Sequence, residues 1–242
     1  MSELEKILKE TEDLRKSKHY TEAINLLERA YKEHSSSNRL KTSLIDLLFE
    51  FGGLQNDELV ANYNEAVVIF KRITQIEPKN YRGHYNLGIA LQNLNQFDEA
   101  IEAFQTAISI KPDYYFCYYN IGLVLEDKKD LGKAIEYYEK ALKIEPNFRY
   151  AKQAISELRE LIGRHSEFEN FIQLKSLMLM SNKVRIDLIQ EILKITKSEL
   201  IVLLIKWGEK FNFNLDGDYL IINKETLDDL FNELENESYA SF

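Results

Sequence analysis

The chain has 242 residues, a net charge of −9 and a pI near 5.2, with 45% hydrophobic and 29% charged residues. This balance is typical of a folded protein of one or two domains, and the acidity disfavours nucleic acid and anionic membranes as partners. The single cysteine, Cys117, excludes an intramolecular disulfide and a cysteine-cluster zinc site, so we expect a reducing, cytoplasmic location. The longest strongly apolar run, 200–205, is far shorter than the roughly 20 residues of a membrane span.

The first 80 residues predict two helical hairpins of unequal spacing. Ser2 and Glu5 form a capping box that opens the first helix. Ala23 and Ala66 hold equivalent positions in the second helices of the two hairpins, but nine more residues separate them than separate the later repeats. The extra residues fall around 52–57, either as a longer loop between helices or as an extended helix.

Three prolines set the period of the central region. Pro78, Pro112 and Pro146 are spaced 34 residues apart. Self-similarity at such a period predicts stacked helical hairpins. The second helix of each hairpin is expected to open at a polar N-cap before a Glu-Ala pair. These N-caps would be Thr21, Asn64 and Asp98.

Residues 81–114 and 115–148 resemble the tetratricopeptide repeat (TPR), whose pattern is an aromatic, Leu-Gly, a large apolar residue, a small alanine, a second aromatic and a closing proline. The matching positions are His84, Leu87, Gly88, Leu91, Ala100, Phe104, Ala107 and Pro112, then Tyr118, Ile121, Gly122, Leu125, Ala134, Tyr138, Ala141 and Pro146. The resemblance implies two antiparallel helices per repeat, with a small residue where their backbones approach most closely. We therefore predict a mainly α protein in which 1–163 forms a TPR α-solenoid of about four hairpins, closed by a capping helix over 150–163 with a polar outer face.

Beyond Gly163 the period disappears, which predicts a second domain over 167–242. Its expected elements are a helix at 168–180, a strand at 184–186, helices at 187–193 and 198–211, a hairpin at Asp216-Gly217 and an acidic helix at 225–234. Asp-Gly between apolar stretches is typical of a type I′ turn. Three helices followed by a two-stranded wing resemble the winged helix of the PCI family, the scaffold proteins of the proteasome lid, the signalosome and translation-initiation assemblies. The resemblance implies a small winged-helix-like α+β domain.

No residue pattern predicts catalysis, a cofactor or a bound metal, and we expect a protein that is not an enzyme. The four histidines, at 19, 34, 84 and 165, are not at metal-ligand spacing, and no phosphate-binding glycine loop is present. His84 holds the aromatic position of its repeat, so we expect it to pack. From 165 to 224, eight Lys and Arg balance eight Asp and Glu, so this segment lacks the basic surface that DNA binding requires.

In TPR arrays the first helix of each repeat lines a concave groove, and the resemblance carries fixed positions of that helix over to this chain. Asn86 and Asn120 share one such position, which resembles the asparagine ladder of the O-linked N-acetylglucosamine transferase array, where amides hold the backbone of an extended peptide. The expected peptide-binding residues are Arg82, Tyr85, Asn86, Ile89, Asn93, Phe116, Tyr119, Asn120, Leu123 and Asp127. Further groove positions are Arg39, Thr42, Ser43, Asp46, Gln92 and Glu126.

Exposed aromatics such as Tyr85, Phe116 and Tyr119 are what protein-binding surfaces favour. We therefore predict a non-catalytic scaffold or adaptor that binds a peptide or helix in the concave groove and docks a second protein through its carboxy-terminal domain. Two alternatives stay open: a transcriptional regulator whose winged helix binds DNA, and a substrate-recruiting subunit of an enzyme complex. The expected partner is a protein or peptide.

Overall fold

The computed structural model describes residues 2–239, with the side chains of 2–164, 166 and 168–234. The chain divides into two compact units, Met1–Ser156 and Glu157–Phe242. Within the described residues, no helix is both long enough and apolar enough to cross a membrane.

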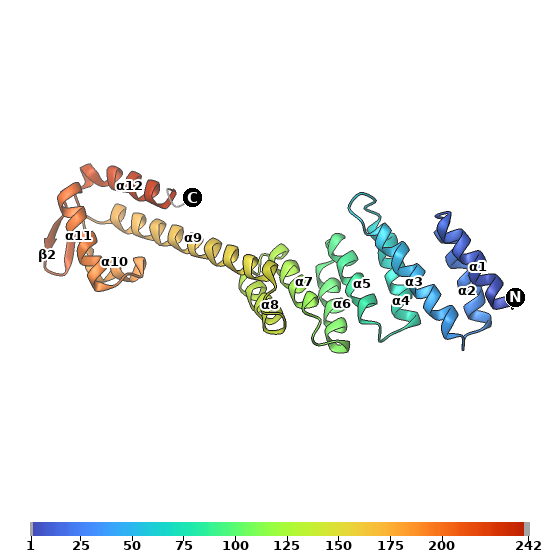
Figure 1. Cartoon of the computed structure of the whole chain (residues 1–242). Helices are drawn as coiled ribbons and strands as arrows, with labels where there is room; N and C mark the ends of the chain where they lie inside the picture. The colour runs from blue at the N-terminus through green and yellow to red at the C-terminus, as the bar shows by residue number, and fades with distance from the viewer. Residues whose placement is uncertain (1, 240–242) are drawn as a thin grey trace. The chain divides into compact units, whose positions relative to one another are not determined.

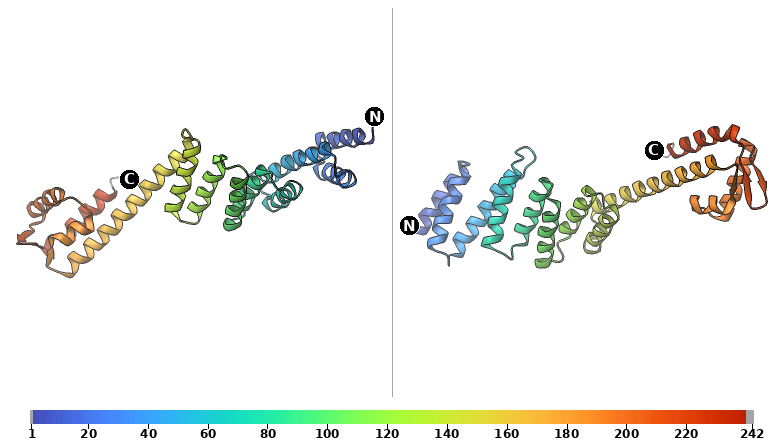
Figure 2. Two further views of the ribbon diagram at one scale, coloured as in Figure 1. Left: turned by 90° about the horizontal axis from the view of Figure 1, so that it is seen from below. Right: turned by 180° about the vertical axis from the view of Figure 1, so that it is seen from behind.

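In the first unit, helices pair into four hairpins that follow one another in chain order (Figure 1). The second helix of each hairpin packs on the first helix of the next, so the hairpins stack in a row, as the right-hand view of Figure 2 also shows. The helices are α1 (Glu3–Lys16), α2 (Tyr20–Glu33), α3 (Asn38–Gln55), α4 (Tyr63–Ile76), α5 (Tyr81–Asn93), α6 (Phe97–Ile110), α7 (Tyr115–Asp127) and α8 (Leu131–Ile144). The predicted solenoid of helical hairpins is confirmed.

The two glycines that the repeat pattern places at the closest approach of the helices have an aromatic ring against them. A Cβ atom on Gly88 would lie 2.6 Å from Cε1 of Phe104, and one on Gly122 would lie closer still to the ring of Tyr138. Both rings are fully buried. A side chain at either glycine would therefore force the two helices of the hairpin apart.

The aromatic position of each repeat ties one hairpin to the preceding one. Nε2 of His84 lies 3.0 Å from the carbonyl oxygen of Pro78, and the hydroxyl of Tyr118 donates to the carbonyl oxygen of Pro112 at 3.1 Å. His84 is half-buried, as a packed side chain should be. Pro78 and Pro112 each stand two residues after a helix ends, and the carbonyl of each is the partner of this contact from the next hairpin.

The second hairpin absorbs its nine extra residues in two places. Helix α3 has 18 residues where α5 has 13, and the connection to α4 runs over 56–62 instead of the three residues between α5 and α6. The helix extension and the longer loop, which the sequence leaves as alternatives, therefore both occur.

The predicted N-caps of the second helices are wrong by two residues. Helices α2, α4 and α6 begin at Tyr20, Tyr63 and Phe97, so Thr21, Asn64 and Asp98 already lie inside their first turns. The chain turns into these helices through a residue with positive φ, and these residues are Lys18, Ala61 and Asn95. One residue in the left-handed region is enough to reverse the chain before each of these helices, and a residue with a side chain can adopt that conformation. The helix can therefore begin two residues before the predicted position.

The helix after the fourth hairpin, α9, is continuous over Arg149–Met180. The predicted break at Gly163 is wrong, because a single glycine costs only about 1 kcal/mol in a helix interior and no proline accompanies it. Ala151 and Ile155 are buried, as expected for a capping face, but Leu161 is exposed. The domain bounds 1–163 and 167–242 stay a prediction.

The second unit combines helices with a small antiparallel sheet. After α9 come β1 (Lys183–Arg185), α10 (Ile186–Leu193), α11 (Lys197–Phe211), β2 (Asn214–Asp216), β3 (Tyr219–Ile221), a 3-10 turn (Lys224–Thr226) and α12 (Leu227–Tyr239). Strand β3 lies between β1 and β2. Helix α12 lies alongside the end of α9 (Figure 2), where the rings of Phe171 and Phe231 are 6.3 Å apart between centroids. The core is apolar and centred on Leu174, Met178, Ile189, Trp207 and Leu230.

The hairpin between β2 and β3 is predicted in the right place, but its turn type differs. The register pairs Asp216 with Tyr219, so Gly217 and Asp218 form the loop, and of these only Gly217 has positive φ. Positive φ at the first loop residue alone is the pattern of a type II′ turn, whereas type I′ needs it at both. Asp216 belongs to the strand, so the glycine comes first in the loop rather than second.

The contact between Gly88 and Phe104 yields a stability prediction. Gly88→Ala should lower the free energy of unfolding by about 1–3 kcal/mol, because the new methyl group overlaps a buried ring. Gly53 in α3 is a matched control, since a Cβ there meets nothing within 4 Å. Gly53→Ala should raise stability by roughly 0.5–1 kcal/mol through helix propensity. Urea denaturation followed by circular dichroism measures both, and equal effects of the two substitutions would contradict the packing described above.

Candidate functional site

The first helices of the hairpins make up one face of the first unit. Helix α1 contacts α3, and α5 contacts α7. On this face, described residues from α1 to the start of α5 line two open pockets. The larger, of about 460 Å³, is lined by Asn38, Lys41, Thr42, Ile45, Asp46, Phe49, Glu77, Asn80 and Arg82. The smaller, of about 110 Å³, is lined by Leu8, Thr11, Glu12, Arg15, Ser43, Asp46 and Leu47.

Arg82 is held at the wall of the larger pocket by an aromatic ring. Its guanidinium carbon lies 5.0 Å from the ring centroid of Phe49, a cation–π contact between α5 and α3. Asp46 lies in the lining of both pockets and joins them. Both charged groups are exposed, and neither is in an ion pair with another described residue. This face therefore carries one cation and one anion that have no ion-pair partner among the described residues.

The rest of this pocket's charge is neutralised internally. Nζ of Lys41 lies 2.9 Å from Glu77, and the side-chain amide of Asn80 donates to the same carboxylate at 2.7 Å. The hydrogen bonds from Lys41 and Asn80 hold the pKa of Glu77 below its ordinary value of 4.5. Glu77 thus connects α3 to the loop before α5 and shapes the pocket wall.

The two asparagines of the predicted ladder are fixed within the protein. Nδ2 of Asn86 donates to the carbonyl oxygen of Arg82 at 2.9 Å, and Nδ2 of Asn120 donates to that of Phe116 at 2.8 Å. Asn120 also donates to the hydroxyl of Tyr85 at 3.3 Å. Both N–H groups of Asn120 and one N–H group of Asn86 are therefore engaged, and each amide oxygen can still accept a hydrogen bond.

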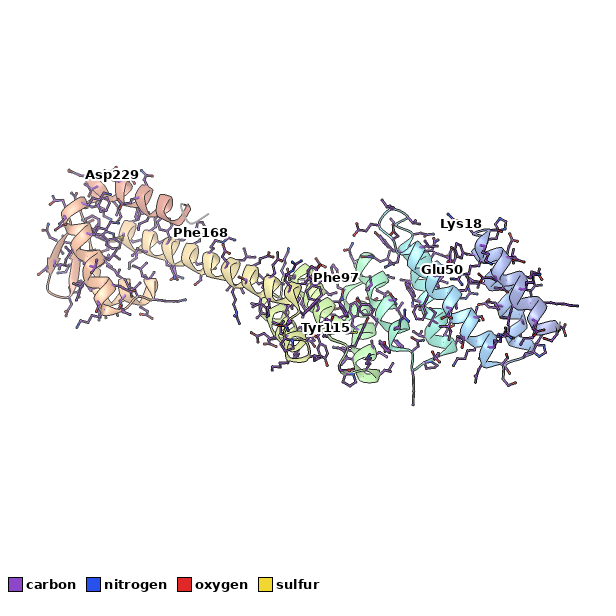
Figure 3. All side chains as sticks on the ribbon, in the orientation of Figure 1. Lys18, Glu50, Phe97, Tyr115, Phe168 and Asp229 are labelled. Carbon is purple, nitrogen blue, oxygen red and sulfur yellow. The ribbon has the colours of Figure 1, made fainter. Side chains whose placement is uncertain are left out.

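The predicted groove aromatics are half-buried, and this corrects the expectation that they stand exposed. Tyr85 packs on Tyr114 with ring centroids 5.1 Å apart, and its hydroxyl pKa is raised by burial. Phe116 and Tyr119 both pack on Phe148, at 5.7 and 5.0 Å. Tyr115, labelled in Figure 3 at the start of α7, stacks on Phe116 at 4.2 Å. The rings fill the space between successive hairpins, so most of their surface is not offered to a ligand.

The other predicted positions connect neighbouring helices or remain at the surface. Gln92 donates to Asp127 at 3.4 Å, and Asn93 donates to Asn56 at 3.2 Å. The hydroxyl of Tyr138 donates to Glu126 inside the last hairpin. Ile89 and Leu123 are half-buried, Thr42, Ser43 and Asp46 line the pockets, and Arg39 lines neither of them.

Sequence reasoning missed several residues that shape this face. Phe49, Lys41 and Glu77 build the larger pocket, and Tyr114 and Phe148 support the groove aromatics. Tyr114 and Phe148 stand 34 residues apart, each two residues after a closing proline, so the period itself offered a signal for them. No such signal marks Phe49, because it lies in the irregular second hairpin.

No group of three or more His, Cys, Asp or Glu among the described residues is placed to hold a metal ion. Cys117 is fully buried, and burial raises the pKa of its thiol to about 12. A thiol with so high a pKa is a poor nucleophile at neutral pH.

The basic side chains of the second unit are largely engaged inside it. Nζ of Lys183 lies 2.8 Å from Asp216, and Arg185 pairs with Asp187. Lys206 and Lys210 of α11 both pair with Glu233 of α12. Lys224 donates instead to the carbonyl oxygens of Met178 and Leu179 at the end of α9, at 2.6 and 2.9 Å.

Comparison with known proteins identifies the repeats. Residues 81–114 and 115–148 each match the family model of the tetratricopeptide repeat, so α5–α6 and α7–α8 are two tandem TPRs. Tetratricopeptide repeats are generally non-catalytic modules for protein–protein interaction. No curated protein matches the chain.

Among solved structures, a crystal structure of the MamA protein is similar over 87% of this chain and 96% of its own, with 21% identity and a TM-score of 0.50, which shows the fold. Another MamA crystal structure covers 63% of this chain and 84% of its own, with 26% identity and a TM-score of 0.49. The first TPR of Spaghetti (RPAP3), bound to the HSP90 peptide SRMEEVD, covers 49% and 93%, with 22% identity and a TM-score of 0.45.

The contacts of Glu77 yield a pH prediction. Because its pKa is lowered in the folded protein, its ion pair stabilises the fold above pH 4.5, and this stabilisation is lost as the pH falls through the lowered value. At pH 7, Glu77→Gln should lower the free energy of unfolding by a few tenths to about 1 kcal/mol, since the pair is partly exposed. The difference from the wild type should shrink as the pH falls below 4.5.

Urea denaturation at pH 7 and at an acidic pH of about 3.5 measures this difference. Glu58→Gln is the control, because Glu58 is exposed in the loop before α4 and no hydrogen bond to a described residue holds it. A loss of stability in Glu77→Gln that stays constant across this pH range would contradict the assigned role of the carboxylate.

Proposed function

We propose that this chain is a non-catalytic scaffold that holds an extended peptide segment on the face made by α3, α5 and α7, while its second unit docks another protein. A cytoplasmic location belongs to the same proposal, and the single reduced cysteine supports it.

The fixed amides of Asn86 and Asn120 carry the first part of this proposal. Each presents an acceptor oxygen whose direction is set by the hydrogen bonds of its own Nδ2. An extended peptide has backbone N–H groups that need such acceptors, and a side chain already held in place loses little entropy when it binds. The two positions are one repeat apart, which suits a ligand that runs across neighbouring hairpins.

The charged side chains at one end of the proposed groove would determine in which direction a peptide binds. Arg82 is held on Phe49, and Asp46 lies in the same pocket. A peptide with an acidic side chain near Arg82 and a basic or amide side chain near Asp46 would satisfy both groups. The groove aromatics contribute a rigid floor rather than the main contact surface, because they already pack on one another.

The order of elements in the second unit supports a winged-helix-like module. A strand, two helices and a hairpin whose last strand pairs with the first strand follow one another after α9. Several of its basic side chains are paired with carboxylates of the same unit, which leaves little free positive charge for phosphates. This pairing supports a protein-docking role over binding to DNA.

A double substitution of the two asparagines tests the groove. A random peptide library displayed on phage is selected against the full chain, and a selected peptide is synthesised with a fluorophore. Asn86→Ala with Asn120→Ala should weaken its binding roughly tenfold or more, because two hydrogen bonds worth about 0.5–1.5 kcal/mol each are lost. Fluorescence anisotropy measures the change in Kd.

The matched control is Gln105→Ala, which removes an exposed amide from α6, a second helix outside the proposed groove. It should leave the Kd unchanged, and thermal melts should show that all variants remain folded. If the selected peptides bind the double variant as tightly as the wild type, the groove proposal is wrong.

A further inference from the structure

Helix α9 carries a row of large apolar side chains that are half-exposed, in addition to those that it buries. Leu161, Phe168, Ile172 and Leu179 are 45%, 48%, 46% and 55% exposed. Phe168 is labelled on α9 in Figure 3. With 3.6 residues per turn, the four positions lie within about 40° of one another around the helix. They therefore form one straight row, which we call the α9 seam.

The spacing of the seam is that of a coiled coil. Phe168 follows Leu161 by seven residues, Leu179 follows Ile172 by seven, and Phe168 and Ile172 are four apart. Steps of three and four that repeat every seven residues are the a and d positions of a heptad. The d positions are 161, 168 and 175, and the a positions are 165, 172 and 179. The row thus has the geometry that one helix offers to another helix.

The seam lies beside the core of the second unit and is separate from it. Phe171, Leu174 and Met178, at the g and c positions of the same heptads, face that core and are at most 9% exposed. Nζ of Lys175 lies 5.6 and 5.0 Å from the ring centroids of Phe171 and Phe231, so this ammonium lies on the side of α12. A helix that packs on the seam would therefore leave the core intact.

The charges beside the seam indicate what would cover it. Arg164 is at a g position, and Glu169 is at the e position five residues later. In a parallel pair of identical helices, a g residue meets the e residue five positions further on in the other helix. Arg164 of each copy would thus meet Glu169 of the other, which gives two ion pairs related by a two-fold axis. In the single chain Arg164 lies 4.0 Å from Glu160, a loose contact that can be exchanged.

The same charges disfavour the opposite orientation. An antiparallel pair could also bring Leu161 opposite Leu179 of the second copy, because the apolar positions of the seam have the same spacing in both directions. That pairing would place Glu169 of one copy beside Glu169 of the other, close to the two-fold axis, where like charges repel. Charge complementarity therefore selects the parallel pair.

We propose that the α9 seam binds a second copy of the chain as a short parallel coiled coil, held by its four apolar residues and oriented by Arg164 and Glu169. The seam spans fewer than three heptads and contains two polar positions, His165 and Lys175. We therefore expect a reversible dimer with a Kd on the order of tens of micromolar. The inference goes beyond the proposed function and uses no residue of the groove, so a monomeric chain would leave the groove proposal as it stands.

Self-association of the full chain is the first test. Sedimentation equilibrium from about 1 to 300 µM should show a transition from 28.4 kDa to twice that mass. Ile172→Glu should raise the Kd at least tenfold, because it places two carboxylates in an apolar contact. The matched control is Ile201→Glu, since Ile201 on α11 is 50% exposed and lies outside the seam; it should dimerise like the wild type. A monomeric wild type, or a dimer that survives Ile172→Glu unchanged, overturns the inference.

Cysteine cross-linking tests the parallel orientation. Leu161→Cys alone and Leu179→Cys alone should each form a disulfide-linked dimer under mild oxidation, because each position meets itself across a parallel seam. In the antiparallel pair the two copies of either position would be about 27 Å apart, at 1.5 Å per residue over eighteen residues. The wild type is the control, since its Cys117 is fully buried. Cross-links that form only when the two variants are mixed overturn the inference.

A charge exchange tests the pairing of Arg164 with Glu169. Arg164→Glu alone and Glu169→Arg alone should each weaken self-association severalfold, because like charges then meet on both sides of the seam. An equimolar mixture of the two variants should associate as tightly as the wild type, because each of these contacts in the mixed dimer joins an arginine to a glutamate. Circular dichroism should show that both variants remain folded. A mixture that stays as weakly associated as each variant alone overturns the inference.

Discussion

The contact between a glycine of the first helix and an aromatic ring of the second is the constraint on which the first unit depends. Gly88 against Phe104 and Gly122 against Tyr138 set how closely the helices of a hairpin approach. In both repeats the ring occupies the place that a side chain on the glycine would take. Tyr138 adds a hydrogen bond to Glu126 of the first helix, so the same residue also fixes the rotation of one helix against the other. These contacts position the face on which the peptide groove is proposed.

The groove is built from side chains that already have partners. Tyr85, Phe116 and Tyr119 connect successive hairpins, and the nitrogens of Asn86 and Asn120 bond to their own helices. A surface held in this way has few conformations to lose when a ligand binds. In the proposed function, this surface offers two acceptor oxygens at fixed places, one repeat apart, to the N–H donors of a peptide backbone.

Much of this fold follows from local patterns in the sequence, and the errors have local causes. The period of Pro78, Pro112 and Pro146 predicts the hairpins because proline lacks the N–H that a helix interior needs, and the capping box at Ser2 is present as expected. The packing of Tyr85 on Tyr114 could not be predicted, because it depends on the rotation between hairpins. The continuous helix through Gly163 and the type II′ turn at Gly217 were missed because each depends on a small energy difference between two local conformations.

The two binding roles proposed for this chain belong to different units and use different chemistry. The proposed groove is polar and its amides are fixed, so it suits an extended strand of peptide. The second unit pairs much of its charge internally, so a protein that docks on it would meet little free positive charge. Because the two roles use different residues on different units, two partners would not compete for the same contacts, and one chain could hold both, which is what a scaffold requires.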